Sequence, residues 1–168
     1  MEVWITTLSE NTANYGFLAE WGLSILVEAD GLSVLVDTKL SYSAVYNAQL
    51  MVIGLSSIDR IMLSHGHADH TGGLREVLKI KGVVEVIGHP NTWAAKYVQC
   101  DQQPVQYCAI PFKRQELESL GVRFKLVKKP VHITEQVMTT REIPMSLAYE
   151  EVENNYLLRK LRCFIQIL

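Results

Sequence analysis

The first forty residues alternate between apolar runs and polar breaks in the way that strands and turns do. Residues 3–8 predict a first strand. Residues 23–28 and 32–37 are nearly continuous in apolar residues and flank Asp30-Gly31, a strong short-range hairpin signal. These runs predict a hairpin in a sheet that is covered on at least one face.

Helical spacing follows the hairpin. Ser41 is expected to cap a helix that runs to about Met51, and Ala44, Val45 and Ala48 fall on its buried face. The later predicted elements are strands at 58–64, 83–87, 122–127 and 132–139, and helices at 72–81, 91–97 and 112–120, the last ended by Gly121. Strands and helices alternate, which indicates an α/β fold with a mixed sheet.

Composition narrows the class of protein. The 168 residues, 48% of them hydrophobic, favour a single domain over residues 1–168, and the net charge of −2 gives no reason to expect nucleic acid. We expect no membrane association, because no apolar run has the length of a membrane-spanning helix and the N-terminus does not resemble a secretory signal. Three cysteines without a Cys-x-x-Cys motif favour reduced thiols in a cytoplasmic protein.

Residues 64–73 gather potential metal ligands. His65, His67, Asp69 and His70 place four of them within six positions, directly after the predicted strand 58–64. Imidazole and carboxylate groups need partners when they leave water, and a metal ion satisfies several at once. Nitrogen and oxygen donors suit zinc, with manganese or iron as alternatives. A solvated polar turn is the competing interpretation, and the flanking strand, Thr-Gly-Gly and helix disfavour it.

The spacing His-x-His-x-Asp-His after a buried strand resembles the signature of the metallo-β-lactamase superfamily. Asp37, at the end of Val-Leu-Val-Asp-Thr, resembles the aspartate that lies beneath the metals in that superfamily. A wider set of segments resembles one subgroup of this superfamily, the metal-dependent hydrolases related to dihydropterin ribofuranosyl-aminobenzene phosphate synthases. These segments are residues 18–24, 63–67, 70–74, 88–90 and 139–144. The resemblance covers nearly all of residues 2–155 and implies an αββα sandwich.

The resemblance also implies a mechanism. His65 and His67 would hold a first metal ion, and Asp69 and His70 a second. A metal-bound hydroxide would attack an ester, amide or phosphoester centre of a small-molecule substrate, and Asp69 would orient the hydroxide. In relatives that use a di-iron pair for redox chemistry, glutamate replaces the second histidine, so His67 favours zinc-type hydrolysis.

One part of the family pattern is missing. The second half of the sandwich normally adds two histidines and a bridging aspartate, but no aspartate follows Asp101 and only His132 follows His89. We therefore expect a truncated domain, with a complete first half, a partial second half and an incomplete metal site. Uncovered sheet surface predicts a homodimer. The alternative function is a non-catalytic, dimer-stabilised remnant that binds metal weakly or not at all.

Further candidate site residues lie outside residues 64–73, the segment that we call the ligand loop. His89 ends a strand and is a candidate substrate contact or extra ligand, with a surface histidine as the alternative. Lys39 stands where the family usually has glycine, and an outward-pointing side chain is favoured over a cation near the metals. Trp4, Trp21 and Trp93 are expected in the core or at its rim rather than as a stacking platform.

Overall fold

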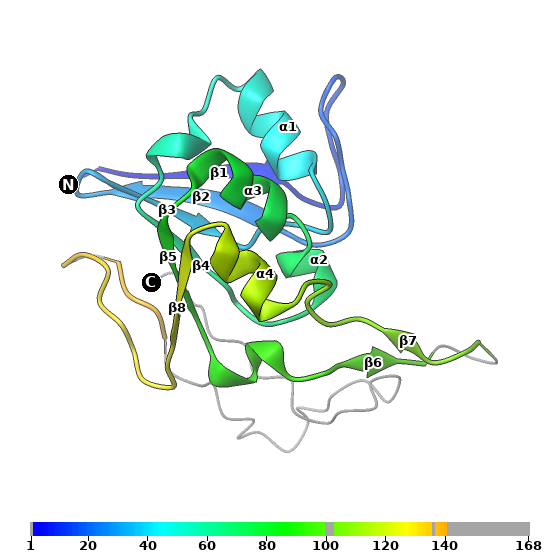
Figure 1. Ribbon diagram of the computed structural model, residues 1–168. Helices are drawn as coiled ribbons and strands as arrows, with labels where there is room; N and C mark the ends of the chain where they lie inside the picture. Colours follow the sequence, from blue (N-terminus) through cyan, green and yellow to red (C-terminus); the bar gives the residue numbers. More distant parts are fainter. Residues whose placement is uncertain (1, 100–102, 136, 141–168) are drawn as a thin grey trace, which may run out of the picture.

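The computed structural model describes residues 2–99, 103–135 and 137–140, and its centre is a six-stranded mixed sheet (Figure 1). The order is β1-β2-β3-β4-β5-β8. These strands are β1 (Val3–Ser9), β2 (Ser24–Ala29), β3 (Leu32–Val36), β4 (Arg60–Met62), β5 (Val84–Gly88) and β8 (Val122–Leu126). β1 pairs with β2, and β2 with β3, in antiparallel orientation. The pairs β3–β4, β4–β5 and β5–β8 are parallel. The predicted α/β fold with a mixed sheet is confirmed.

The helices α1, α3 and α4 lie together on one face of this sheet (Figure 1). The helical elements are α1 (Ser43–Leu50), α2 (Ala68–Thr71), α3 (Leu74–Lys81), α4 (Arg114–Ser119) and the short 3₁₀ turns η1 (Leu55–Ser57) and η2 (Pro90–Trp93). Strand register brings Leu35, Ile61 and Val86 side by side toward the helices. Each such side chain contributes about 1.5–3 kcal/mol when it is fully buried.

The opposite face of the sheet carries a second apolar cluster. Val34, Val36, Met62 and Ile87 belong to it, and the partly buried side chains of Val131, Ile133 and Val137 pack against it. Arg60 and Glu85 lie next to each other on this same face and form an ion pair of 3.3 Å. Coverage of both faces explains why the runs that form β2 and β3 are almost continuously apolar.

The hairpin between β2 and β3 has the geometry that its sequence predicts. Asp30 and Gly31 have φ values of 53° and 76°. Two consecutive positive φ values characterise the type I′ turn, whose twist matches that of the flanking strands. The predicted hairpin is confirmed.

Ser41 does not cap α1 as predicted. Tyr42 holds the N-cap position and makes no side-chain cap hydrogen bond. The carboxylate of Glu20 instead accepts hydrogen bonds from the backbone N–H groups of Ser41 and Ser43, at 2.7 and 3.1 Å. A carboxylate at a helix N-terminus interacts favourably with the helix dipole. Glu20 comes from a loop that is distant in sequence, so the residues around Ser41 could not predict this cap.

Two other local predictions are wrong. Residues 91–97 form no helix: the short turn η2 is followed by β6 (Tyr97–Val98), which pairs with β7 (Gln106–Tyr107) in a separate two-stranded ribbon. Of residues 132–135 and 137–139, His132 and Met138 form an isolated bridge in place of the predicted strand. Cys100, Cys163 and the chain beyond residue 140 lie outside the described residues. Within the described ranges, no helix has the length and apolar character to cross a membrane.

Gly73 provides a test of how tightly the ligand loop packs on the segment after β3. A Cβ at Gly73 would overlap the carbonyl oxygens of Thr38 and Ser41. We predict that Gly73→Ala lowers the free energy of unfolding by about 2 kcal/mol, measured by urea denaturation. Gly54→Ala is the control, because a Cβ there meets only ordinary contacts, and it should stay within about 0.5 kcal/mol of the parent. Equal midpoints for the two variants would contradict this packing.

Candidate metal centre

The ligand loop lies at the edge of the sheet where β3 and β4 end. Asp37 directly follows β3, and residues 64–70 follow the parallel strand β4, so both segments emerge at one edge. The backbone ties them together: Asp37 N–H donates to Met62 O, and Thr38 N–H donates to His70 O, each at 2.8 Å. This is the carboxyl edge of parallel strands, where α/β proteins commonly place their sites.

Asp37 is the central connection of the loop. Its side chain is 1% exposed. Its carboxylate accepts hydrogen bonds from Ser64 N–H at 2.8 Å, from Ser64 Oγ at 2.6 Å and from His70 Nδ1 at 2.6 Å. Because Nδ1 of His70 donates to Asp37, Nε2 is the nitrogen left to bind a metal ion.

Ser64 extends this network to His65. Its hydroxyl donates its single proton to Asp37, so it accepts the hydrogen bond of 2.9 Å from His65 Nδ1. The ring of His65 therefore presents the lone pair of Nε2. Sequence reasoning missed Ser64, although its place directly before the first histidine was an available signal.

The four candidate ligands come together in two pairs. His65 Nε2 lies 3.1 Å from His67 Nδ1, and His70 Nε2 lies 3.5 Å from Asp69 Oδ2. Two nitrogens bound to one zinc ion at about 2.0–2.1 Å in tetrahedral geometry are roughly 3.3 Å apart. Both pairs therefore have the spacing of ligands that share an ion.

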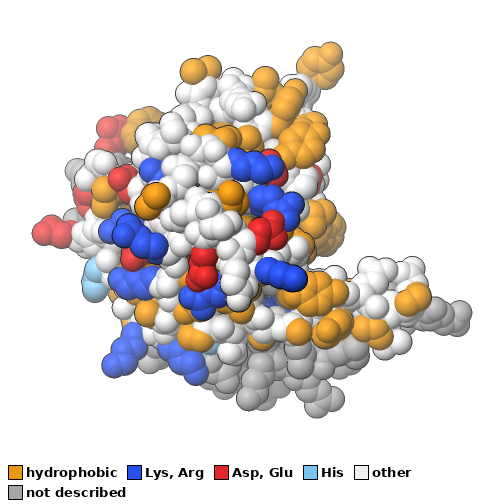
Figure 2. Space-filling model, viewed as in Figure 1, with side chains coloured by type: hydrophobic (Ala, Val, Ile, Leu, Met, Phe, Trp, Pro, Cys, Tyr) orange, Lys and Arg blue, Asp and Glu red, His pale blue; other side chains and the backbone are white. Residues whose placement is uncertain are grey.

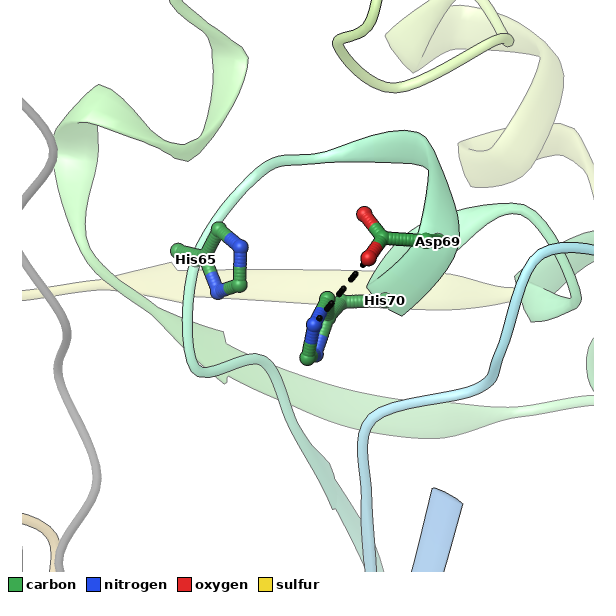
Figure 3. Close-up of side chains that lie close together, drawn as sticks. All are labelled: His65, Asp69 and His70. Carbon is green, nitrogen blue, oxygen red and sulfur yellow. Dashed lines mark ion pairs between the residues drawn. The ribbon is translucent and has the colours of Figure 1, made fainter. Parts of the chain in front are cut away.

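The two pairs also face each other. Ligand atoms of His65, Asp69 and His70 all lie within 4.8 Å of one another, and Figure 3 shows these side chains converging between the ligand loop and α2. The rings of His65 and His70 have centroids 4.2 Å apart. The donor set of His65, Asp69 and His70 and its spacing fit a metal ion.

Burial sets the protonation of the rings. It lowers the pKa of His65 from 6.5 to about 3, helped by the nearby His70, His67 and Lys96. Burial also lowers the pKa of His67. Burial would lower the pKa of His70 as well, but its hydrogen bond to Asp37 and the charge of that carboxylate outweigh burial and raise it. His65 and His67 are therefore neutral at pH 7, the form that binds metal.

Lys39 departs from its expected outward orientation. It is fully buried, and its Nζ donates to the carbonyl oxygens of Glu20 and Gly22, the latter at 2.7 Å. Burial lowers the pKa of Lys39, while Glu20, Glu10 and Asp69 act in the opposite direction. Its φ of 68° lies in the left-handed region, which costs a non-glycine residue roughly 1–2 kcal/mol. The outward-pointing prediction is wrong, because loop carbonyls are in reach to solvate the ammonium group.

His89 is neither on the surface nor close to solvent. It follows β5, is 2% exposed, and its Nδ1 accepts a hydrogen bond of 3.0 Å from the backbone N–H of Asn91 at the start of η2. The surface alternative is therefore wrong. A role in substrate binding or as an extra ligand stays a prediction.

A second buried lysine, Lys96, lies near the ligand loop, and no sequence signal marks it. The Nζ of Lys96 donates to the carbonyls of Asn91, Thr92 and Ala94 at 3.0, 3.3 and 2.9 Å. A Cβ at Gly66 would come within 2.9 Å of that same Nζ. The backbone of the ligand loop at Gly66 therefore lies close to this ammonium group, whose charge helps to lower the pKa of His65 and of His67.

The family match coincides with the segment that carries the loop. Residues 22–97 match the family model described as the metallo-beta-lactamase superfamily. The chain is 33% identical over 147 residues to 7,8-dihydropterin-6-methyl-4-(beta-D-ribofuranosyl)-aminobenzene-5'-phosphate synthase of Methanocaldococcus jannaschii, covering 83% of this chain and 50% of that one. It is 27% identical over 157 residues to the uncharacterized protein MJ0448 of the same organism, covering 89% and 57%. The chain spans about half the length of these curated relatives.

Solved structures agree on the fold. Tm1679, described as a metal-dependent hydrolase of the beta-lactamase superfamily, matches with a TM-score of 0.71 at 24% identity, covering 90% of this chain and 52% of that one. The metallo-beta-lactamase fold protein YhfI from Bacillus subtilis matches with a TM-score of 0.56 at 15% identity, covering 98% and 57%. The resemblance to the metallo-beta-lactamase superfamily is confirmed, and the chain has the fold of that superfamily.

The pKa of His65 generates a prediction for the metal-free protein. The pKa of His65 is 6.5 in the unfolded chain and about 3 in the folded chain, so protonation at low pH favours the unfolded chain. The free energy of unfolding is therefore unaffected by this histidine above pH 6.5 and decreases as the pH falls toward 3. We predict that His65→Asn makes the free energy of unfolding less dependent on pH between 6.5 and 4, with a difference of more than about 1 kcal/mol across that window. Urea titrations at several pH values measure it. Parallel curves for parent and variant would show that His65 is not buried as described.

Proposed function

We propose that this chain is a hydrolase domain that depends on a zinc-type metal ion and cleaves an ester bond in a small molecule. The observation that supports it most directly is the pairing of donors: His65 with His67, and Asp69 with His70, each at a spacing that suits one shared ion. Mixed nitrogen and oxygen donors suit zinc, and manganese or iron are the alternatives. Two ions are proposed, one for each pair.

A bound zinc-type ion would supply hydroxide at neutral pH, because coordination lowers the pKa of water to about 7. The residues of the chain then have separate tasks. Asp37 holds His70 with Nε2 turned toward the ions, and Ser64 does the same for His65. Asp69, whose carboxylate lies 3.5 Å from His70 Nε2, is proposed to accept a hydrogen bond from the nucleophile and to orient it.

A phosphoester is the substrate class that we propose. The synthase relative is named for a product that carries a dihydropterin, an aminobenzene and a ribose phosphate. A further fold relative is described as a diphosphatase of the PhnP family, with a TM-score of 0.58 at 17% identity and coverage of 97% of this chain and 61% of that one. A small substrate suits the net charge of −2 better than a nucleic acid does. The homodimer and the cytoplasmic location expected from the sequence stay predictions.

The proposal predicts that metal binding and turnover depend on the same side chains. Purified protein loaded with zinc should hydrolyse bis(4-nitrophenyl) phosphate, and His67→Ala should reduce turnover by more than about 100-fold. Asp37→Asn should weaken zinc binding by about 10- to 100-fold, because it disturbs the orientation of His70 without removing a ligand.

His132→Ala is the matched control, since His132 is exposed and belongs to neither donor pair. It should keep the parent's zinc content and turnover. Turnover that survives His67→Ala with zinc still required would refute the proposed site, and no turnover by any zinc-loaded form would refute the proposed function.

A further inference from the structure

β1 lies at the edge of the six-stranded sheet (Figure 1). Within residues 2–99, 103–135 and 137–140, β2 is the only strand that pairs with it. The register between the two strands shifts between Thr7 and Ser9, so the regular part of β1 is Val3–Thr7. An edge strand has backbone N–H and C=O groups that point away from its sheet, and these groups can pair with a further strand.

The neighbouring strands show which backbone groups of β1 point outward. Ser33 N–H donates to the carboxylate of Asp59, and Ser33 O accepts from Asp59 N–H, each at 2.8 Å. Ser33 therefore has no backbone group left for Glu28, which lies opposite it on β2. Because bonding alternates along antiparallel strands, Glu28 directs its backbone groups toward β1, where its partner is Trp4.

This alternation determines the direction of the other backbone groups in the regular part of β1. Trp4 and Thr6 direct their groups toward β2, and Val3, Ile5 and Thr7 direct theirs toward the open edge. Proteins commonly protect such an edge with charged side chains, with proline or with a bulge. Residues 3–7 contain no charge and no proline, and the register shift follows them. The edge therefore lacks the usual protection against strand pairing.

The side chains of the same segment are apolar and exposed. Val3, Trp4 and Ile5 are 40%, 61% and 54% exposed, so Trp4 is not in the core. Ile5 pairs with Val27 of the second apolar cluster, whereas Trp4 lies on the same face as Leu26, which packs beneath the helices. Exposed apolar side chains on both faces of one edge are typical of an association surface.

α1 adds apolar surface next to this edge. It packs against β1, and Asn47 Nδ2 donates to Leu8 O at 2.8 Å. Tyr46 and Leu50, four residues apart on α1, are 37% and 48% exposed. Figure 2 shows hydrophobic side chains gathered over this helix. A strand added to the edge would therefore lie beside a helix with exposed apolar side chains.

Charge selects one register in which a second copy of β1 can pair with the first. Two identical strands related by a twofold axis pair antiparallel, and residues that point outward must lie opposite each other. With Ile5 opposite Ile5, Val3 lies opposite Thr7, and about six backbone hydrogen bonds form. Moving the axis one residue toward the end of β1 would place Glu2 opposite Glu10, and like charges that are directly opposite destabilise a sheet. Moving it the other way shortens the paired segment.

We propose that the β1 strands of two copies of this chain pair antiparallel about Ile5 and join the two six-stranded sheets into one. The pairing covers Ile5 with its own counterpart and places each Trp4 opposite Thr6 of the other copy, on the face that carries α1. It gives the homodimer expected from the sequence a particular interface. No residue of the candidate metal centre takes part, so the interface is independent of the proposed function.

Sedimentation equilibrium of the full chain tests this interface through the mass in solution. The parent should have twice the 19.0 kDa mass of one chain. Ile5→Lys and Ile5→Glu should each weaken the dimer by more than about 100-fold, because the twofold axis places two like charges directly opposite each other. An equimolar mixture of these two variants should regain the dimer mass, because opposite charges then meet across the same axis.

Val83→Lys is the matched control. Val83 is 65% exposed, so the substitution also places a charge at an exposed apolar position, but it precedes β5 inside the strand order. This variant should keep the parent's mass. A monomeric parent, a dimer that survives Ile5→Lys unchanged, or a mixture of the two Ile5 variants that stays monomeric would each overturn the interface.

Hydrogen exchange followed by NMR tests the same pairing without any substitution. The amides of Ile5 and Thr7 point toward the open edge, and the amide of Thr6 points toward β2. In the dimeric parent, all three should exchange at rates within about tenfold of one another, because each then donates a backbone hydrogen bond. Rapid exchange at Ile5 and Thr7 beside a protected Thr6 amide, in protein of dimer mass, would place the interface elsewhere and overturn the proposal.

Discussion

The buried carboxylate of Asp37 is the constraint on which the candidate metal centre depends. It sits at the end of β3 with a φ of 55°, and it accepts hydrogen bonds from Ser64 and His70. Burying a carboxylate costs free energy unless its oxygens accept hydrogen bonds. Asp37 therefore requires Ser64 and His70 as donors, and it in turn fixes the positions of both residues. Through this one group the sheet determines where the ligand loop starts and how its last histidine is turned.

Close backbone approach then completes the arrangement. Gly66, Gly22 and Gly73 each pack so tightly against a neighbouring carbonyl that a Cβ would overlap it. Two buried ammonium groups, from Lys39 and Lys96, bind carbonyls of two segments that pack against the ligand loop. The loop is thus held by its backbone, which leaves the ligand side chains to point inward together. A preorganised set of donors binds metal without first losing conformational freedom.

Features that depend on local sequence were predicted well. The Asp30-Gly31 turn, the apolar strands and the grouping of His65, His67, Asp69 and His70 all follow from neighbouring residues. Features that depend on distant partners could not be predicted. The carboxylate of Glu20, 21 residues before Ser41, caps α1 in place of Ser41. Lys39 is buried because carbonyl oxygens from another loop accept hydrogen bonds from its ammonium group. The predicted helix at 91–97 is replaced by a 3₁₀ turn and the strand β6, which pairs with residues that no local pattern connects to it.

Anomalous X-ray diffraction from zinc-soaked crystals locates a bound metal without relying on activity. We expect one zinc peak within bonding distance of His65 and His67, and a second within bonding distance of Asp69 and His70, with Asp37 still hydrogen-bonded to His70. Zinc bound elsewhere, while these four side chains keep their present positions without it, would show that they are not the metal ligands.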